Sequence, residues 1–150
     1  TRNVVLAAHA LDALPVEPST ATWITYIRCH DDIGWAIGDA DADAVARAIA
    51  NSPLVKTAVF GHDANLGRVA SAAGKCGVTF DQRRVDIDLL GVPVCRSGLA
   101  VAMDEDDMLK RFKESEVPIA IDLGMGSCST RVWTCDLTHD YVTINGDYRT

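Results

Sequence analysis

The sequence of 150 residues predicts an α+β fold, with a mixed, largely antiparallel sheet and packed helices. Three observations support this fold class. Helix and strand patterns follow one another in mixed order, whereas regular strand–helix repeats would predict a parallel sheet. Two apolar runs flank Leu90-Gly91, which is typical of a hairpin. Length and composition, with 48% hydrophobic and 23% charged residues, are those of a globular domain that can bury a core.

The first 38 residues are expected to hold one helix and one strand. Apolar residues recur at helical spacing over residues 3–14, and Pro15 and Pro18 then end the helix. Residues 22–27 are dense in β-branched and aromatic side chains, a composition that favours a strand. The polar residues 29–32 would follow at the C-terminal edge of that strand.

The middle of the chain predicts two helices with a strand between them. Three aspartates in residues 39–43 suit the first turn of a helix, which Asn51-Ser52-Pro53 ends. The apolar stripe of this helix is expected at Ala44, Val45, Ala48 and Ile49. Residues 54–60 predict a buried strand, residues 61–65 a turn, and residues 66–75 a second helix.

A hairpin is expected next, followed by a helix. Residues 85–89 and 92–95 form its two strands, and Pro93 marks the second strand as an edge strand, because proline donates no ladder hydrogen bond. Asp104 is placed to cap the following helix. The apolar residues expected to face inward from that helix are Met108, Leu109 and Phe112.

The C-terminal part predicts two more strands, over residues 118–123 and 130–137. Residues 124–127, with two glycines and a serine, suit the turn that joins them. A polar tail follows.

Charge and cysteine content exclude several classes of function. The net charge of −7 gives no basic excess to displace the counterions of a nucleic acid, so a nucleic-acid partner is not expected. No apolar run approaches the roughly 20 residues that a membrane helix needs. Five scattered cysteines fit neither a zinc site nor a redox pair, so we expect reduced thiols in the cytoplasm, no metal and no cofactor.

Two long segments carry a family resemblance: DAVARAIANSPLVKTAVFGHDANLGRVASAAG, which begins at Asp43, and WTCDLTHDYVTINGDYRT, which ends at Thr150. Residues 43–150 closely resemble the C-terminal part of the β-chain of bifunctional ornithine acetyltransferase/glutamate N-acetyltransferase. The resemblance implies acetyl transfer from N-acetylornithine to glutamate in arginine biosynthesis. It also implies a small amino-acid substrate and an assembly of α- and β-chains, so an α-chain partner or self-association is expected.

The tail Ile144-Asn145-Gly146-Asp147-Tyr148-Arg149-Thr150 resembles the terminal motif of that family. Through this resemblance Asn145 and Thr150 correspond to its substrate-binding asparagine and terminal threonine. An amide and a hydroxyl can both hydrogen-bond the polar end of ornithine or glutamate. The alternative is a frayed polar terminus, which many proteins have.

No catalytic residue is assigned, because the segment that carries the family's catalytic threonine has no counterpart upstream of residue 43. Thr1 could mimic a processed N-terminal threonine, but the residues after it do not resemble the family's segment. We therefore expect the chain alone to be inactive.

The turn GHDANLGR offers one further interpretation. His62 and Asp63 could act as an acid/base pair, whereas the simpler prediction is a turn in which Asn65 caps the following helix. Leu66 stands where relatives usually have tryptophan. Lys56 and Arg68 are expected to be solvated or paired with carboxylates.

Residues 1–42 resemble something else, the segment of amylosucrase-like α-amylase-family enzymes in which His30-Asp31 would bind sugar. The other two carboxylates that glycoside cleavage needs are absent. A metal site at residues 29–32 is the alternative. We expect residues 1–42 not to form an independent domain and residues 1–38 to pack loosely or at an edge. The chain could thus be a chimeric or generated non-enzymatic protein, or a remnant of an amylosucrase-like enzyme.

Overall fold

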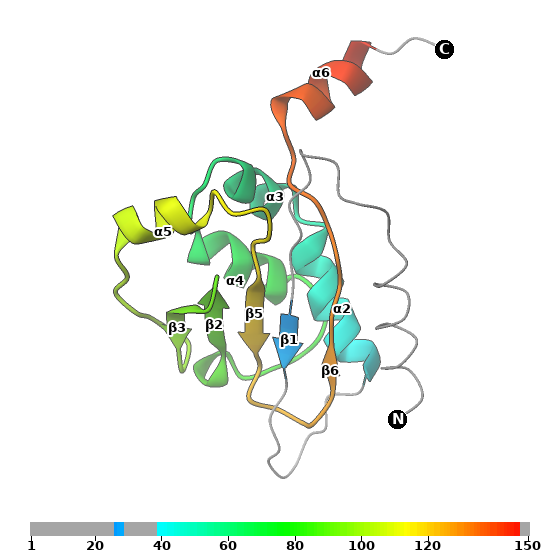
Figure 1. The fold of residues 1–150 in the computed structure, drawn as a ribbon. Coiled ribbons are helices and arrows are strands. Elements are labelled where there is room, and N and C mark those ends of the chain that lie inside the picture. Colours follow the sequence, from blue (N-terminus) through cyan, green and yellow to red (C-terminus); the bar gives the residue numbers. More distant parts are fainter. Residues whose placement is uncertain (1–25, 29–38, 148–150) are drawn as a thin grey trace.

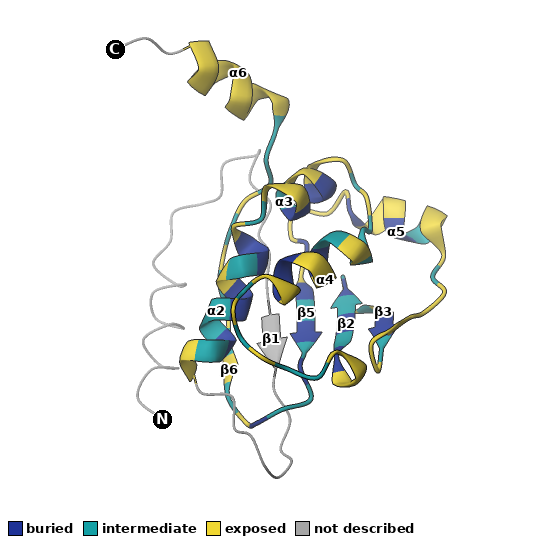
Figure 2. Ribbon diagram, turned by 180° about the vertical axis from the view of Figure 1, so that it is seen from behind, coloured by how far each residue is buried: buried dark blue, intermediate teal, exposed yellow. Residues whose placement is uncertain are grey.

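A six-stranded mixed sheet organises the computed structural model, which describes residues 26–28 and 39–147. The strand order is β4-β3-β2-β5-β1-β6. Figures 1 and 2 show helices α2 and α4 covering one face of this sheet, with α3 and α5 beyond the upper ends of the strands. All pairings but one are antiparallel, so the expected α+β fold is confirmed.

Helix α2 (Asp39–Ala50) begins with acidic residues in its first turn, as expected, and they complement the positive end of the helix dipole. Its buried stripe is rotated from the prediction. The buried residues are Ala42, Val45, Ala46, Ile49 and Ala50, whereas Ala44 and Ala48 are only half-buried. Because Ala42 and Ala46 have no bulk, α2 can lie close to α4 and to the sheet.

The expected strand over residues 54–60 is wrong, because this segment is helix α3 (Pro53–Phe60). The Ser52 hydroxyl accepts a hydrogen bond from the Val55 N–H at 3.4 Å, and Pro53 occupies the first turn, where its missing N–H costs nothing. Its buried residues are Val55, Ala58 and Val59, a helical spacing. The β-branched residues of this segment favour a strand, but the Ser52 cap and the tertiary contacts stabilise a helix.

Helix α4 (Leu66–Gly74) confirms the second predicted helix to within one residue at its end. The Asn65 side chain accepts from the Arg68 N–H at 3.1 Å, which confirms the predicted cap. Buried Val69, Ala72 and Ala73 face α2 and the sheet.

The predicted hairpin is present as β2 (Asp86–Leu89) and β3 (Val92–Arg96). It follows a short 3₁₀ helix, η1 (Gln82–Arg84). A second two-residue turn, Ser97-Gly98, leads into β4 (Leu99–Ala100). The expectation that Pro93 marks an edge strand is therefore wrong, because β4 is the outermost strand. Proline is tolerated because β4 pairs only with Cys95 and Arg96.

Helix α5 (Glu105–Arg111) has the expected cap, since the Asp104 carboxylate accepts from the Asp107 N–H at 3.0 Å. Met108 and Phe112 are buried as predicted. Leu109 is not buried, since 46% of its surface is exposed.

The centre of the sheet contains β5 (Ile119–Asp122) and, beside it, β1 (Tyr26–Arg28) in parallel. The outer strand β6 (Ser129–Thr130) pairs with β1 rather than with β5. The backbone of residues 26–28 is thus held between two strands, and the expected attachment of this segment at an edge is wrong. Most of the strand expected over residues 130–137 lies in no strand.

The chain ends in helix α6 (His139–Asp147), which extends away from the rest of the molecule (Figure 1). None of its residues is buried. Thr1, the helix expected over residues 3–14, the polar residues 29–32 and Thr150 lie outside the described residues.

Candidate functional site

The turn between α3 and α4 is built by backbone hydrogen bonds that reverse the chain within a few residues. His62 N–H donates to the Val59 carbonyl at 3.1 Å, and Asp63 N–H to the Ala58 carbonyl at 2.9 Å. His62 adopts a positive φ of 56°, a left-handed conformation in which histidine is enriched among non-glycine residues. The turn closes with the Asn65 amide donating to the Asp63 carboxylate at 2.9 Å.

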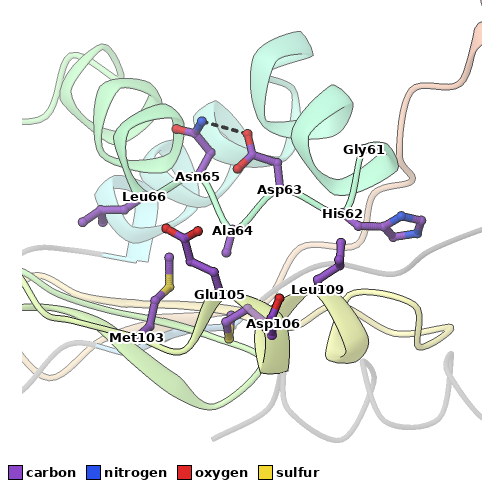
Figure 3. Close-up of a pocket in the computed structure, with 11 residues that line it drawn as sticks. Gly61, His62, Asp63, Ala64, Asn65, Leu66, Met103, Glu105, Asp106 and Leu109 are labelled. Atoms are coloured by element: carbon purple, nitrogen blue, oxygen red, sulfur yellow. Dashed lines mark hydrogen bonds between the residues drawn. The ribbon is translucent and has the colours of Figure 1, made fainter.

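The two residues considered as an acid/base pair point in different directions. Figure 3 shows the Asp63 carboxylate turned toward Asn65 and the His62 ring turned away from it. Asp63 is therefore used within the turn, and the geometry supports the turn interpretation over an acid/base role.

A cavity of about 580 Å³ lies between this turn and the start of α5 (Figure 3). Its wall combines the carboxylates of Asp63, Glu105 and Asp106 with apolar side chains. The lining residues are Gly61, His62, Asp63, Ala64, Asn65, Leu66, Met103, Glu105, Asp106, Met108 and Leu109. No serine, threonine, cysteine or lysine is among them, so they offer no hydroxyl, thiol or amine to carry an acyl group.

Sequence reasoning did not predict this cavity. Its two halves end at Leu66 and begin again at Met103, and the signal was a polar turn followed much later by Asp104-Glu105-Asp106 at a helix start. Only the packing of α5 against the α3–α4 turn brings them together.

A second polar cluster forms where the chain leaves the body toward α6. The Leu137 N–H donates to the Lys56 carbonyl at 3.3 Å, and the rings of Phe60 and His139 meet edge to face at 5.4 Å. Partial burial raises the pKa of the Asp136 carboxyl, and attraction to Lys56 and His62 opposes this shift only in part. The pairing of Lys56 with a carboxylate stays a prediction.

Arg68 departs from both expected outcomes. Its guanidinium donates to the Leu54 carbonyl at 2.9 Å and to the Thr57 hydroxyl at 3.2 Å, so it joins α4 to α3 instead of pairing with a carboxylate.

The described cysteines are free thiols, and two of them have altered acidity. Burial raises the pKa of the Cys95 thiol, which donates to the Val85 carbonyl at 3.6 Å. A hydrogen bond to Asp39 raises the pKa of the Cys128 thiol. Both shifts keep the thiol protonated and so disfavour a nucleophilic role.

The predicted substrate-binding residue Asn145 lies in α6 and is exposed. Its side-chain amide donates to the Tyr141 carbonyl one turn earlier, at 2.8 Å. Since α6 extends away from the body, the structure does not bring Asn145 to the cavity (Figure 1). Thr150, the other predicted residue, lies outside the described part.

Residues 26–28 and 39–147 contain no group of three or more histidine, cysteine, aspartate or glutamate side chains that could hold a metal ion. Within the same ranges, no helix has the length and apolar character to cross a membrane.

Comparisons with known proteins agree with one another. The family model described as "ArgJ family" matches residues 29–150. Among curated relatives, the arginine biosynthesis bifunctional protein ArgJ of Desulfotalea psychrophila is 52% identical over 112 residues, which are 74% of this chain and 28% of the relative. The protein of the same name from Zymomonas mobilis is 44% identical over 118 residues, 78% of this chain and 29% of its own length.

Among solved structures, the crystal structure of the arginine biosynthesis bifunctional protein ArgJ from Bacillus halodurans is similar, with a TM-score of 0.76 and 32% identity. The similarity covers 87% of this chain and 58% of that one. The chain thus spans somewhat more than a quarter of the length of the curated relatives that it matches.

Proposed function

The chain belongs to the ArgJ family, and we propose on that basis that it is the C-terminal part of an enzyme transferring acetyl groups from N-acetylornithine to glutamate in arginine biosynthesis. The observation that carries the proposal is the match of the family model through residue 150, which includes the terminal motif with Asn145 and Thr150. The solved relative of the same fold supports it.

By itself, the chain is proposed to be inactive. Acyl transfer through a covalent intermediate needs an activated nucleophile and a base next to it. Neither the lining of the cavity nor the protonated thiols of Cys95 and Cys128 supply one among the described residues. We propose that the acetyl-carrying threonine comes from the part of the family protein that these 150 residues do not contain.

Asn145 and Thr150 are proposed to bind the amino-acid substrate once that part is present. The exposure of α6 supports this role, because the helix is available to a partner. Large apolar side chains on α6 are also exposed, at Tyr141, Val142 and Ile144, and such a patch is typical of a surface that another chain covers. The proposed partner is the α-chain.

The test is complementation between two chains. The 150-residue chain is mixed with a family relative truncated before the segment equivalent to residue 43, and acetyl transfer from N-acetylornithine to glutamate is measured. We expect no transfer by either chain alone and transfer by the mixture. Transfer by the 150-residue chain alone would contradict its inactivity, and an inactive mixture whose chains demonstrably bind would contradict the proposed function.

The role of Asn145 is tested in the same mixture with Asn145→Ala. We expect KM for the amino-acid substrate to rise about tenfold or more, because the hydrogen bond between the Asn145 amide and the substrate is lost. Thr143→Ala, two residues away on the same exposed helix, is the matched control and should leave KM unchanged. Equal effects of both variants would indicate a role in docking the helix instead of binding substrate.

The cytoplasm is the proposed compartment. The free thiols of the described cysteines support a reducing environment, in which disulfides do not persist.

A further inference from the structure

The segment that leads from β6 to α6 is held against α2 and α3. The Thr134 hydroxyl donates a hydrogen bond to the carbonyl of Ala50, the last residue of α2, at 2.9 Å. Further along, the Leu137 N–H donates to the Lys56 carbonyl in α3 at 3.3 Å. Between these two hydrogen bonds, Asp136 is half-buried. The chain therefore reaches the start of α6 along a defined path.

The first turn of α6 has a cap and an aromatic contact to α3. The Thr138 hydroxyl accepts a hydrogen bond from the Tyr141 N–H at 3.0 Å, which fixes where the helix begins. The ring of His139, the first residue of α6, meets the ring of Phe60, the last residue of α3. The ring centroids are 5.4 Å apart and the ring planes are inclined by 82°, an arrangement that aromatic pairs prefer.

Phe60 lies outside the buried face of α3. The buried residues of this helix are Val55, Ala58 and Val59, whereas 36% of the surface of Phe60 is exposed. No residue of α6 is buried either, so the contact between the two rings joins surface elements and does not fill the core. Such a contact should affect the direction of α6 more than the stability of the body.

From these contacts we infer that Phe60 is a positioning residue for Asn145, because its contact with His139 sets the direction in which α6 leaves the body. Asn145 lies six residues beyond His139 on the same helix, a distance of about 9 Å along the helix axis. A tilt of about 30° at the base of α6 would displace Asn145 by about 5 Å, more than a hydrogen bond to a substrate tolerates. The inference rests on the proposed binding of the amino-acid substrate by Asn145.

The first test is NMR relaxation of the backbone amides of the full chain, which does not depend on acetyl transfer. In the unaltered chain, the amides of α6 should move with the sheet and have order parameters of about 0.85. Phe60→Ala should lower these values toward about 0.6, and Phe60→Tyr, which keeps the ring, should restore them. Leu54→Ala, at another exposed apolar residue of α3 (57%), is the matched control and should leave α6 unchanged. An α6 that moves equally in the unaltered chain and in Phe60→Ala would overturn the inference.

The second test is acetyl transfer by the mixture of the two chains, with the partner chain in excess so that complex formation is complete. Phe60→Ala should raise KM for the amino-acid substrate about two- to tenfold, the range by which an aromatic pair shifts an equilibrium, and should change kcat by less than about twofold. Phe60→Tyr should restore KM, and Leu54→Ala should leave it unchanged. An active mixture in which Phe60→Ala leaves KM unchanged would overturn only the role of Phe60. An inactive mixture of unaltered chains that bind each other would overturn the proposed function and, with it, this role.

Discussion

Two turns of the same length show how single residues shape this fold. Leu90-Gly91 and Ser97-Gly98 each join two strands, and all four residues have positive φ, between 48° and 75°. Such turns match the twist of the strands they connect and favour asparagine or glycine, so leucine and serine are unusual in their first position. The Leu90-Gly91 turn was predictable because apolar runs flank it on both sides. The Ser97-Gly98 turn was not predictable, because the strand that follows it, β4, is only two residues long.

The two glycines allow backbone strain to be separated from steric conflict. Gly98→Ala should lower the free energy of unfolding by about 3 kcal/mol or more, because φ is positive and the added Cβ would lie 2.2 Å from the Gln82 carbonyl oxygen. Gly91→Ala is the matched control. It has nearly the same φ but open space around the Cβ, so about 1 kcal/mol is expected. Urea unfolding measures both, and equal losses would contradict the steric part of the argument.

Asp136 gives a prediction that depends on pH. Its pKa is raised in the folded state, chiefly by burial, so ionisation of this group costs stability. The contribution of Asp136 to stability is therefore fully present below its unfolded pKa, about 3.9, and is lost as pH rises through the higher folded value. Asp136→Asn should thus be more stable than the unaltered chain at pH 7, with the difference vanishing near pH 3.

The measurement is the free energy of unfolding of both proteins across this pH range. Asp140→Asn, on exposed α6, is the control for the loss of one negative charge near this end of the chain. A less stable Asp136→Asn at pH 7 would mean that attraction to Lys56 and His62 outweighs the cost of burial.

Helix α3 differs from the other helices in how well its local sequence predicts it. Acidic first turns and side-chain caps predicted α2, α4 and α5 well, because these signals act within a few residues. The same signal precedes α3 as Ser52-Pro53, although the β-branched residues that follow favour a strand. Which side of each helix is buried was less predictable. The buried stripe of α2 and the exposure of Leu109 depend on what packs against each helix, and the spacing of apolar residues alone does not determine this.

The cap of α3 is a direct test of this explanation. Ser52→Ala should lower the free energy of unfolding by about 1 kcal/mol, because the Val55 N–H loses its acceptor. Ser71→Ala, at an exposed position within α4, is the control and should be neutral or slightly stabilising because alanine is the better helix former. Circular dichroism during thermal unfolding measures the stability of both variants. Equal losses of stability would show that the Ser52 cap does not stabilise α3.

For the whole molecule, the decisive surprise is the place of residues 26–28. Local patterns predicted a strand here, but strand order depends on contacts between distant segments, and β1 meets β5 about 90 residues later. The candidate site has the same dependence: the cap by Asn65 was predictable from the turn, whereas the cavity required α5 to pack against it. The exposed position of Asn145 follows from α6 having no buried face, which its weakly periodic sequence did not reveal.

The inner position of β1 leads to a last prediction. Ile27 is aligned with Ile121 of β5 on one side and with Thr130 of β6 on the other, so its backbone has a neighbouring strand in both directions. Ile27→Pro removes the N–H group and should lower the free energy of unfolding by about 3 kcal/mol or more, because proline is not accommodated within a sheet. Ile27→Val keeps the backbone and the β-branched side chain and should cost about 1 kcal/mol or less. If residues 26–28 only attached at an edge, the Ile27→Pro protein would unfold at nearly the same urea concentration as the unaltered chain. This substitution therefore distinguishes a strand inside the sheet from a loosely held segment.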